Sequence, residues 1–290
     1  MSEKQSELAL DESVLEEVLR EEDRDEAGAP EPAAPATREG DEVENEDAAD
    51  PDPRGHVDQP PPDEDEPAPR GLVKIKELQG VPLFYERDGN PRPFPFLVAD
   101  SFLPNLRRTV QQVVERVPEQ AFGRLQRISS AGTFVNKPGM HGKGRAMDWD
   151  RWAFEKLAIA PIQRHHEAAS KPQRQRYWAL AAICRANSAF ILHGRYDAAH
   201  ADHIHHDDSS RVGFAQTRST VALVQAVLND IFDATPQLEI DGGFGGKTKG
   251  ALERAMRKVG LSSNFTDADQ FVRFLRRSGR LGFRRSVGVP

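Results

Sequence analysis

Histidines gather in one short stretch of this chain of 290 residues. Residues 200–206 read HADHIHH, so four of the nine histidines lie within seven positions. Side chains alternate between the faces of a strand, so His203 and His205 would direct their imidazoles to the same side. They could be two metal ligands, or one ligand and one catalytic neighbour. A catalytic zinc takes three protein ligands and keeps a fourth position for water, so further groups must come from elsewhere in the chain.

The stretch HGKGRAMD, residues 141–148, offers such groups. His141 and Asp148 lie seven positions apart, and the glycines between them let the backbone turn and approach other segments closely. Asp150 has the same strand parity as Asp148 and could orient a ligand or cap a turn. Zinc lowers the pKa of bound water and polarises a carbonyl group, so these residue types together favour metal-assisted hydrolysis.

Both stretches resemble signatures of one group of zinc peptidases. HGKGRAMD resembles the HxxGxAxD signature of the LAS metallopeptidases, which include lysostaphin-like, D-Ala-D-Ala-cleaving and hedgehog-like domains. HADHIH resembles the second signature of that group, and its spacing is closest to the murein endopeptidase branch. The wider segment GTFVNKPGMHGKGRAMDWDRW is similar to the extensin-like C-terminal family, which is related to D-alanyl-D-alanine carboxypeptidases.

The resemblance covers roughly residues 97–208 and implies a role for five side chains. It implies that His141, Asp148 and His205 bind Zn²⁺. It also implies that His203 acts as the base or stabilises the transition state, and that His200 has an accessory catalytic role.

The chain departs from the family pattern at two places. Many members carry a serine two residues before the first ligand, where this chain has Gly139. Many also use a glutamate a few residues before the last ligand as the base, where this chain has Ala199, Ala201 and Asp202. We therefore expect His203 to be the base.

The sequence also predicts whether the other histidines are exposed or structural. His206 would lie on the opposite strand face from His205, so we expect it to face solvent. His165 and His166 belong to the polar stretch IQRHHEAASKPQRQR and are expected to be exposed, whereas His193 is expected to be structural. Two aspartates are expected to hold neighbouring histidines or backbone groups: Asp202 and Asp207.

A third resemblance lies in the C-terminal part of the chain. DGGFGGKT, residues 241–248, with the flanking QAVLN and ALERAM, resembles the peptidoglycan-binding domain 1 family, a small three-helix bundle. Its match covers about residues 216–261. Physically, the four glycines allow positive φ values in a tight turn, Phe244 would fill the core, and Thr248 would begin the next helix.

Periodicity predicts the elements that position these residues. An amphipathic helix is expected at residues 104–118, followed by strands in RLQRISSAGTFV and GRAMDWDRWAF on either side of a turn. A helix at residues 171–188 and a strand in AFILHGRY precede HADHIHH. This mixture predicts an α+β fold, in which a small antiparallel sheet with flanking helices holds the zinc site.

Three further helices are expected after residue 210, in STVALVQAVLNDIFD, KTKGALERAMRKVGL and FTDADQFVRFLRRSGR. Ser219 is the expected N-cap of the first, and Thr266 and Asp269 have capping-box spacing before the third. The expected organisation is a disordered tail at residues 1–70, a metallopeptidase domain at 71–210 and a peptidoglycan-binding domain at 211–290.

Charge divides the chain in the same way. Residues 1–70 carry a formal charge of −19 and 10 of the 21 prolines, whereas the remaining residues carry +12. Such an acidic, proline-rich segment cannot bury enough apolar surface to fold by itself. The one exception is an amphipathic stretch at residues 8–22, which is either a nascent helix without a role or a segment that docks on a partner.

The basic remainder suits anionic wall polymers, and the chain lacks the interleaved aromatic residues that would favour nucleic acid. Cys184 stands alone in an apolar run, so we expect it to be buried. Neither a signal-peptide pattern nor an apolar run of membrane-spanning length is present, so we expect synthesis in the cytoplasm. The protein would then act at the cell wall, in the periplasm or outside the cell after lysis or non-classical delivery, and the tail could contact a delivery or injection apparatus.

Taken together, these patterns predict a zinc-dependent peptidoglycan hydrolase. An endopeptidase that cuts crosslink or stem peptides is favoured over a D,D-carboxypeptidase. The alternative is a non-catalytic wall-binding or assembly protein in which the metal has a structural role. A structural zinc normally has four protein ligands, which distinguishes the two interpretations.

Overall fold

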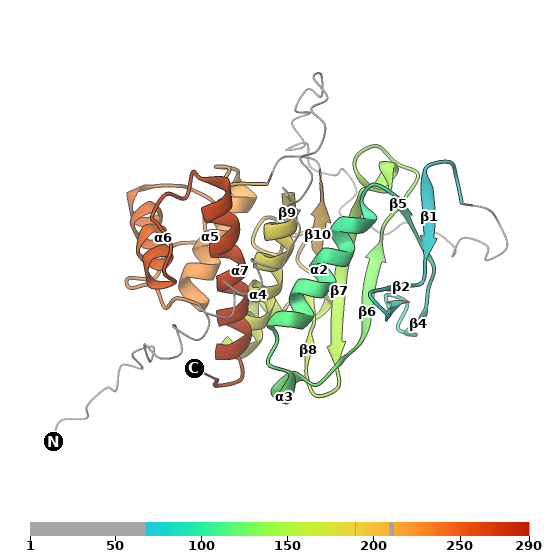
Figure 1. The fold of residues 1–290 in the computed structure, drawn as a ribbon, viewed down its shortest axis with the longest axis horizontal. Coiled ribbons are helices and arrows are strands. Elements are labelled where there is room, and N and C mark those ends of the chain that lie inside the picture. Colours follow the sequence, from blue (N-terminus) through green and yellow to red (C-terminus); the bar gives the residue numbers. More distant parts are fainter. Residues whose placement is uncertain (1–67, 189, 209–211, 290) are drawn as a thin grey trace.

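The computed structural model describes residues 68–188, 190–208 and 212–289. Its helices and sheets confirm the predicted α+β class (Figure 1). The expected disordered tail up to residue 67 and the expected helix at residues 8–22 lie outside these ranges. Within the described ranges, no helix has both the length and the apolar character needed to cross a membrane.

Most strands belong to a central sheet with the order β2-β3-β6-β7-β10-β9, in which β4 also pairs with β3 and β8 with β7. The prediction of an antiparallel sheet is wrong at one place, because β3 runs parallel to β6. β1 and β5 form a separate antiparallel ribbon. The strand bounds are β1 Leu72–Ile75, β2 Glu77–Leu78, β3 Val81–Tyr85, β4 Arg92–Pro93, β5 Phe96–Ala99, β6 Leu125–Gly132, β7 Ala146–Phe154, β8 Ala158–Ile159, β9 Phe190–Leu192 and β10 Ile204–Asp207.

The pairing of β7 with β10 brings the two histidine-containing stretches together. The strands are antiparallel and His205 lies opposite Asp148, although 57 residues separate the two in sequence. Their neighbours Met147 and His206 also pair, point to the other face of the sheet and are fully buried. The sheet therefore has an apolar face that contributes to the core and a polar face that carries the site.

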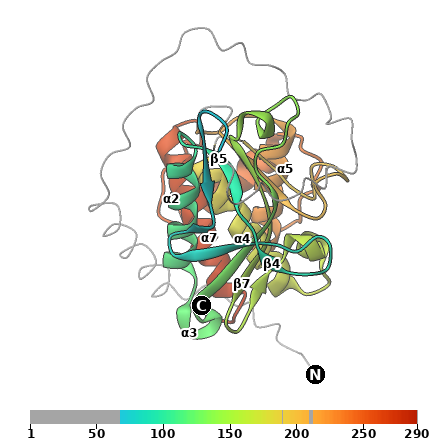
Figure 2. The same cartoon turned by 90° about the vertical axis from the view of Figure 1, so that its right-hand side faces the viewer.

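Helices cover the apolar face. α4 packs against β8, β9 and β10, and α2 lies beside it (Figures 1 and 2). α2 spans Leu103–Arg116 and α4 spans Lys171–Asn187, close to the predicted ranges. Cys184 is buried in α4, as expected. The shorter helices are α3 Glu119–Phe122, η1 His141–Lys143, η2 Pro161–Gln163 and η3 His165–Glu167.

Three helices follow residue 217, as predicted. Thr217 rather than Ser219 caps the first of them, because the Thr217 hydroxyl accepts a hydrogen bond from the Thr220 N–H at 3.2 Å. The Ser219 hydroxyl instead donates to the Ile191 carbonyl, which ties the helix to β9. The helix bounds are α5 Arg218–Asp230, α6 Gly246–Lys258 and α7 Ala268–Arg285.

The glycine-rich turn before α6 contains fewer glycines with positive φ than its sequence predicts. Only Gly242 of the four glycines has a positive φ, at 74°. Phe244 is half-buried and its ring centroid lies 4.9 Å from that of Phe214, so it contributes to the core as expected. Thr248 is buried in the first turn of α6, close to the predicted helix start.

α7 packs along α4 rather than only against α5 and α6 (Figure 1). The two helices approach each other closely at Gly282, where an added Cβ would lie 2.9 Å from the Ala179 Cβ. A side chain at this position would force the two helices apart. The hydrophobic core consequently continues from the sheet through α4 into α5 and α7, across the predicted boundary at residue 210.

Candidate metal centre

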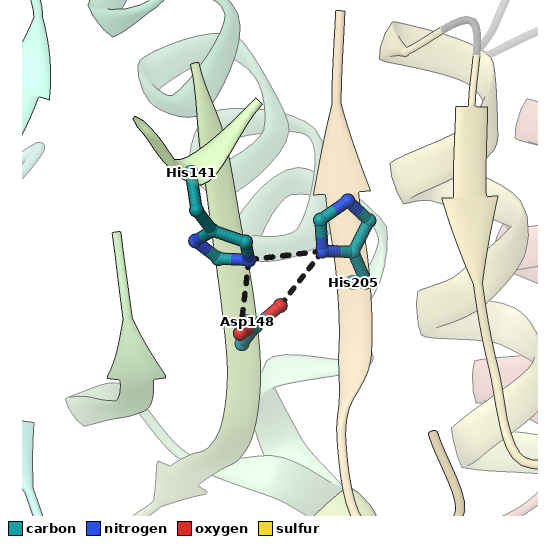
Figure 3. A group of neighbouring side chains, drawn as sticks. All are labelled: His141, Asp148 and His205. Atoms are coloured by element: carbon teal, nitrogen blue, oxygen red, sulfur yellow. Dashed lines mark hydrogen bonds and ion pairs between the residues drawn. The ribbon is translucent and has the colours of Figure 1, made fainter. Parts of the chain in front are cut away.

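Three side chains from separate segments converge on the polar face of the sheet (Figure 3). His141 comes from η1, Asp148 from β7 and His205 from β10. His141 Nε2 lies 3.1 Å from His205 Nδ1 and 3.2 Å from Asp148 Oδ2, and His205 Nδ1 lies 2.9 Å from Asp148 Oδ1. These are the three residues that the sequence predicts as ligands, and they form a group that could hold a metal ion.

The neighbours of the two imidazoles decide which nitrogen faces the centre. His141 Nδ1 lies 2.5 Å from the Thr133 carbonyl oxygen, which can only accept, so this nitrogen carries the proton. His205 Nε2 lies 3.0 Å from Asp207 Oδ2, and the same argument places its proton there. In the neutral imidazoles, His141 Nε2 and His205 Nδ1 then both direct lone pairs toward the Asp148 carboxylate. These three acceptors with a common focus form a group that could hold a metal ion in place of a proton.

The spacing of these atoms suits a small tetrahedral metal ion. With Zn–N and Zn–O distances of about 2.0–2.2 Å, two ligand atoms of a tetrahedral site lie ~3.3–3.6 Å apart. The separations of 2.9–3.2 Å between His141, Asp148 and His205 are slightly shorter, so a small outward shift of the side chains would make room for such an ion. The ligand side chains retain 9–11% of their exposure, whereas Asp207 behind His205 is fully buried. The three ligand side chains are therefore largely buried, and Asp207 supports His205 from the protein interior.

The electrostatics of the cluster also favour a cation. Burial tends to raise the pKa of Asp148, but electrostatic interactions with His141 and His203 and hydrogen bonds from His141 and His205 outweigh burial and hold the pKa well below its usual value. Burial tends to lower the pKa of His205, but its hydrogen bonds to Asp148 and Asp207 raise it to about 10. The same carboxylates that stabilise a proton on His205 would stabilise a metal ion in its place.

The two expected catalytic histidines lie at the edge of this cluster. His203 directs Nε2 toward the centre, 3.8 Å from Asp148 Oδ1, and its Nδ1 donates to Asp202 Oδ1 at 2.8 Å. The His200 ring centroid lies 5.1 Å from that of His203, and its Nδ1 is 2.6 Å from Asp197 Oδ1. Burial lowers the pKa of His200 despite this carboxylate.

The expectation that His206 faces solvent is wrong. Its parity is correct, but the face opposite the site is the core, so its ring is fully buried. Its Nδ1 accepts a hydrogen bond from Trp149 Nε1 at 3.0 Å, and its ring lies edge-on to Phe102 with centroids 5.7 Å apart. Burial lowers its pKa to about 3, so it is a neutral core residue.

The expected exposure of His165 and His166 is also wrong. The polar stretch folds into η3, which packs against α4, and both rings are buried. His166 lies against Tyr177, and an added Cβ at Gly194 would come within 2.2 Å of its ring, so that glycine makes room for it. His193 is fully buried and hydrogen-bonded to the Ser219 carbonyl, which agrees with a structural role.

Sequence reasoning missed one residue near the site, Arg87. It lies in the turn after β3, within YERDGN, where no spacing distinguishes it from other surface arginines. Its guanidinium bridges Asp150 and Asp202, so Asp150 holds this arginine rather than capping a turn. Asp202 and Asp207 each hold a histidine, as expected.

Comparisons with protein-family models, with curated proteins and with solved structures each found no match for this chain. The assignment of the site therefore depends on its geometry and on the motifs themselves.

Proposed function

We propose that this protein is a zinc-dependent peptidase that hydrolyses peptide bonds in peptidoglycan. The observation that carries the proposal is the convergence of His141 Nε2, His205 Nδ1 and the Asp148 carboxylate beside His203. Two imidazoles and one carboxylate are a ligand set that catalytic zinc sites use. Zn²⁺ bound there would lower the pKa of a water molecule and polarise the scissile carbonyl group.

His203 is the residue that we assign as the base. Its Nδ1 proton is engaged by Asp202, so the acceptor lone pair of the neutral imidazole is on Nε2, the atom that faces Asp148. An imidazole in this position can take a proton from an attacking water and pass it to the leaving amine. His200 lies against His203 and is placed to support it.

Peptidoglycan as the substrate is supported by the sequence. The HGKGRAMD and HADHIH motifs resemble peptidases that act on cell walls, and DGGFGGKT independently resembles a peptidoglycan-binding module. The charge of +12 on residues 71–290 suits an anionic polymer. The spacing of HADHIH favours an endopeptidase over a D,D-carboxypeptidase, and a C-terminal anchor would raise the local concentration of substrate.

The test is to incubate the zinc-loaded protein with purified peptidoglycan, with and without a chelator, and to identify the fragments by mass spectrometry. We expect crosslinked peptides to be cut with release of new amine termini, and we expect chelation to stop this and zinc to restore it. Asp148→Asn should abolish both zinc retention and hydrolysis. Asp100→Asn, an exposed carboxylate that belongs to no ligand group, is the matched control and should behave as the wild type.

The outcomes separate the alternatives. Release of single D-alanine residues would identify a carboxypeptidase. A protein that binds the wall and retains zinc but produces no new amine termini would be a non-catalytic binding or assembly protein. Full activity of Asp148→Asn would contradict the assignment of the metal site.

A further inference from the structure

We propose that Arg87 is a positioning residue that fixes the base His203 through Asp202. This inference rests on the proposed function, in which His203 takes the proton of the attacking water. It adds a residue that lies more than fifty positions before the first metal ligand and belongs to neither histidine motif.

The Arg87 guanidinium is held on two sides. Its Nε and one terminal nitrogen donate to the two oxygens of Asp150 at 2.8 and 2.6 Å, which is the bidentate geometry of a strong arginine–carboxylate pair. Its other terminal nitrogen donates to Asp202 Oδ2 at 2.9 Å. Asp150 is fully buried in β7 and the Arg87 side chain is only 7% exposed, so this cation is anchored to the sheet rather than placed on the surface.

Asp202 connects Arg87 to the base, because it contacts both side chains. Its Oδ2 accepts from Arg87, and its Oδ1 accepts from His203 Nδ1 at 2.8 Å and more weakly from a second Arg87 nitrogen at 3.4 Å. The latter contact assigns the Nδ1–H tautomer, which leaves Nε2 as the atom that can accept a proton near Asp148. A continuous chain of contacts therefore runs from β7 through Asp150, Arg87 and Asp202 to His203.

The arginine is needed because Asp202 alone is poorly held. Its side chain is 42% exposed and it lies in the loop before β10, not in the sheet. An exposed carboxylate in a loop samples several rotamers, and each change of rotamer would release or turn the His203 ring. The rigid fork of a guanidinium bound to two carboxylates removes this freedom, which a flexible ammonium group would not do as well.

The competing role for Arg87 is direct binding of a substrate carboxylate. The geometry favours positioning, because all three guanidinium nitrogens already donate to Asp150 or Asp202, and two carboxylates neutralise the charge that would attract a substrate. A direct clamp would affect KM, whereas a positioning residue would affect kcat.

The experiment measures kcat and KM on a soluble crosslinked muropeptide for Arg87→Gln and Arg87→Lys, together with zinc content and melting temperature. Misplacing a catalytic group by about 1 Å can cost ~100-fold, so we expect kcat to fall about 10- to 100-fold with KM changed less than about twofold. Zinc content should be unchanged. The matched control is Arg151→Gln, which removes a comparable pair with Glu86 in the same sheet without contact to His203 and should retain kcat.

A double-mutant cycle identifies the route of the effect. If Arg87 acts through Asp202, the double variant Asp202→Ala/Arg87→Gln should have the same kcat as Asp202→Ala alone. Additive losses, or an increase in KM alone, would overturn the inference. Arg87→Lys keeps the positive charge, so this variant is expected to fold even if Arg87→Gln does not. If both variants fold and neither changes kcat, the positioning role of Arg87 is wrong.

A readout without substrate keeps this inference distinct from the proposed function. Long-range ¹⁵N imidazole spectra should show a fixed Nδ1–H tautomer of His203 in the wild type and in Arg151→Gln, and an averaged signal in Arg87→Gln. If the wild type shows this tautomer but cuts no peptidoglycan, the proposed function fails while the positioning stands. If the tautomer of His203 is the same in Arg87→Gln, the positioning role is wrong whatever the activity.

Discussion

At the scale of single residues, the orientation of each imidazole depends on an acceptor behind it. The Thr133 carbonyl holds His141 and the Asp207 carboxylate holds His205, and both contacts direct the remaining nitrogen to the centre. Such supporting groups raise ligand basicity and restrict the ring, so they contribute to metal affinity without contacting the ion.

Asp207 offers a direct test of this support. We expect Asp207→Asn to weaken zinc binding about 10- to 100-fold, because an amide carries no charge and holds the His205 tautomer less firmly. Competition with a chelating dye would measure the dissociation constant. Asp208→Asn is the control, since the neighbouring carboxylate binds Arg145 and touches no ligand. Equal affinities of the two variants would contradict this role of Asp207.

At the scale of elements, α7 packs closely against α4, the helix that contacts β8, β9 and β10 of the sheet. Gly282 faces Ala179, and an added methyl group would also meet the tip of Ile231 at 2.7 Å. An alanine side chain has no rotamer by which it could make room, so one of the helices must shift.

Two glycine substitutions in helices should therefore have opposite effects. Gly282→Ala should lower the free energy of unfolding by about 1–3 kcal/mol, because overpacking outweighs its better helix propensity. Gly250→Ala in α6 should raise it by up to about 1 kcal/mol, since the added Cβ would meet only the end of the Arg254 side chain at 3.4 Å. Urea denaturation of both variants measures these differences. An increase in the free energy of unfolding of Gly282→Ala would show that α4 and α7 leave room for a methyl group at this position.

At the scale of the whole molecule, several histidines belong to the core rather than to the site. His165, His166 and His193 are buried, and burial lowers the pKa of each to about 4. They are neutral in the folded protein at neutral pH, whereas in the unfolded chain they take up protons near pH 6.5. Below pH 6.5 the unfolded chain therefore binds more protons than the folded protein. As a result, the free energy of unfolding is highest above pH 6.5 and decreases as the pH falls toward 4.

This linkage predicts the pH dependence of folding. For His193 alone, a shift from 6.5 to about 4 corresponds to a loss of about 2 kcal/mol between pH 7 and pH 5. The free energy of unfolding from urea titrations should therefore fall less steeply over this range in His193→Gln, in which glutamine can still donate to the Ser219 carbonyl and does not titrate. The comparison cancels the contribution of the metal site, which both proteins share. Identical slopes would mean that His193 is protonated or accessible in the folded protein.

The local pattern of the sequence was sufficient to predict many elements. Residues with helical spacing predicted α2 and α4 to within one or two residues, and the two histidine motifs contain all three residues of the candidate metal group. The N-cap of α5 was missed because the Ser219 hydroxyl has a partner in β9, 28 residues earlier.

By itself, the sequence determined which residues share a face. Strand periodicity places His203 with His205 and puts His206 on the other side, and this holds in the structure. The tertiary structure decided what each face contacts: the face that bears His206 is the core, because α2 and α4 cover it, while the face that bears His205 carries the polar groups of the site. It also decided that Arg87 reaches Asp202, 115 residues away. Periodicity is a property of neighbouring residues along the chain, whereas burial and ion pairing depend on which distant segments pack together.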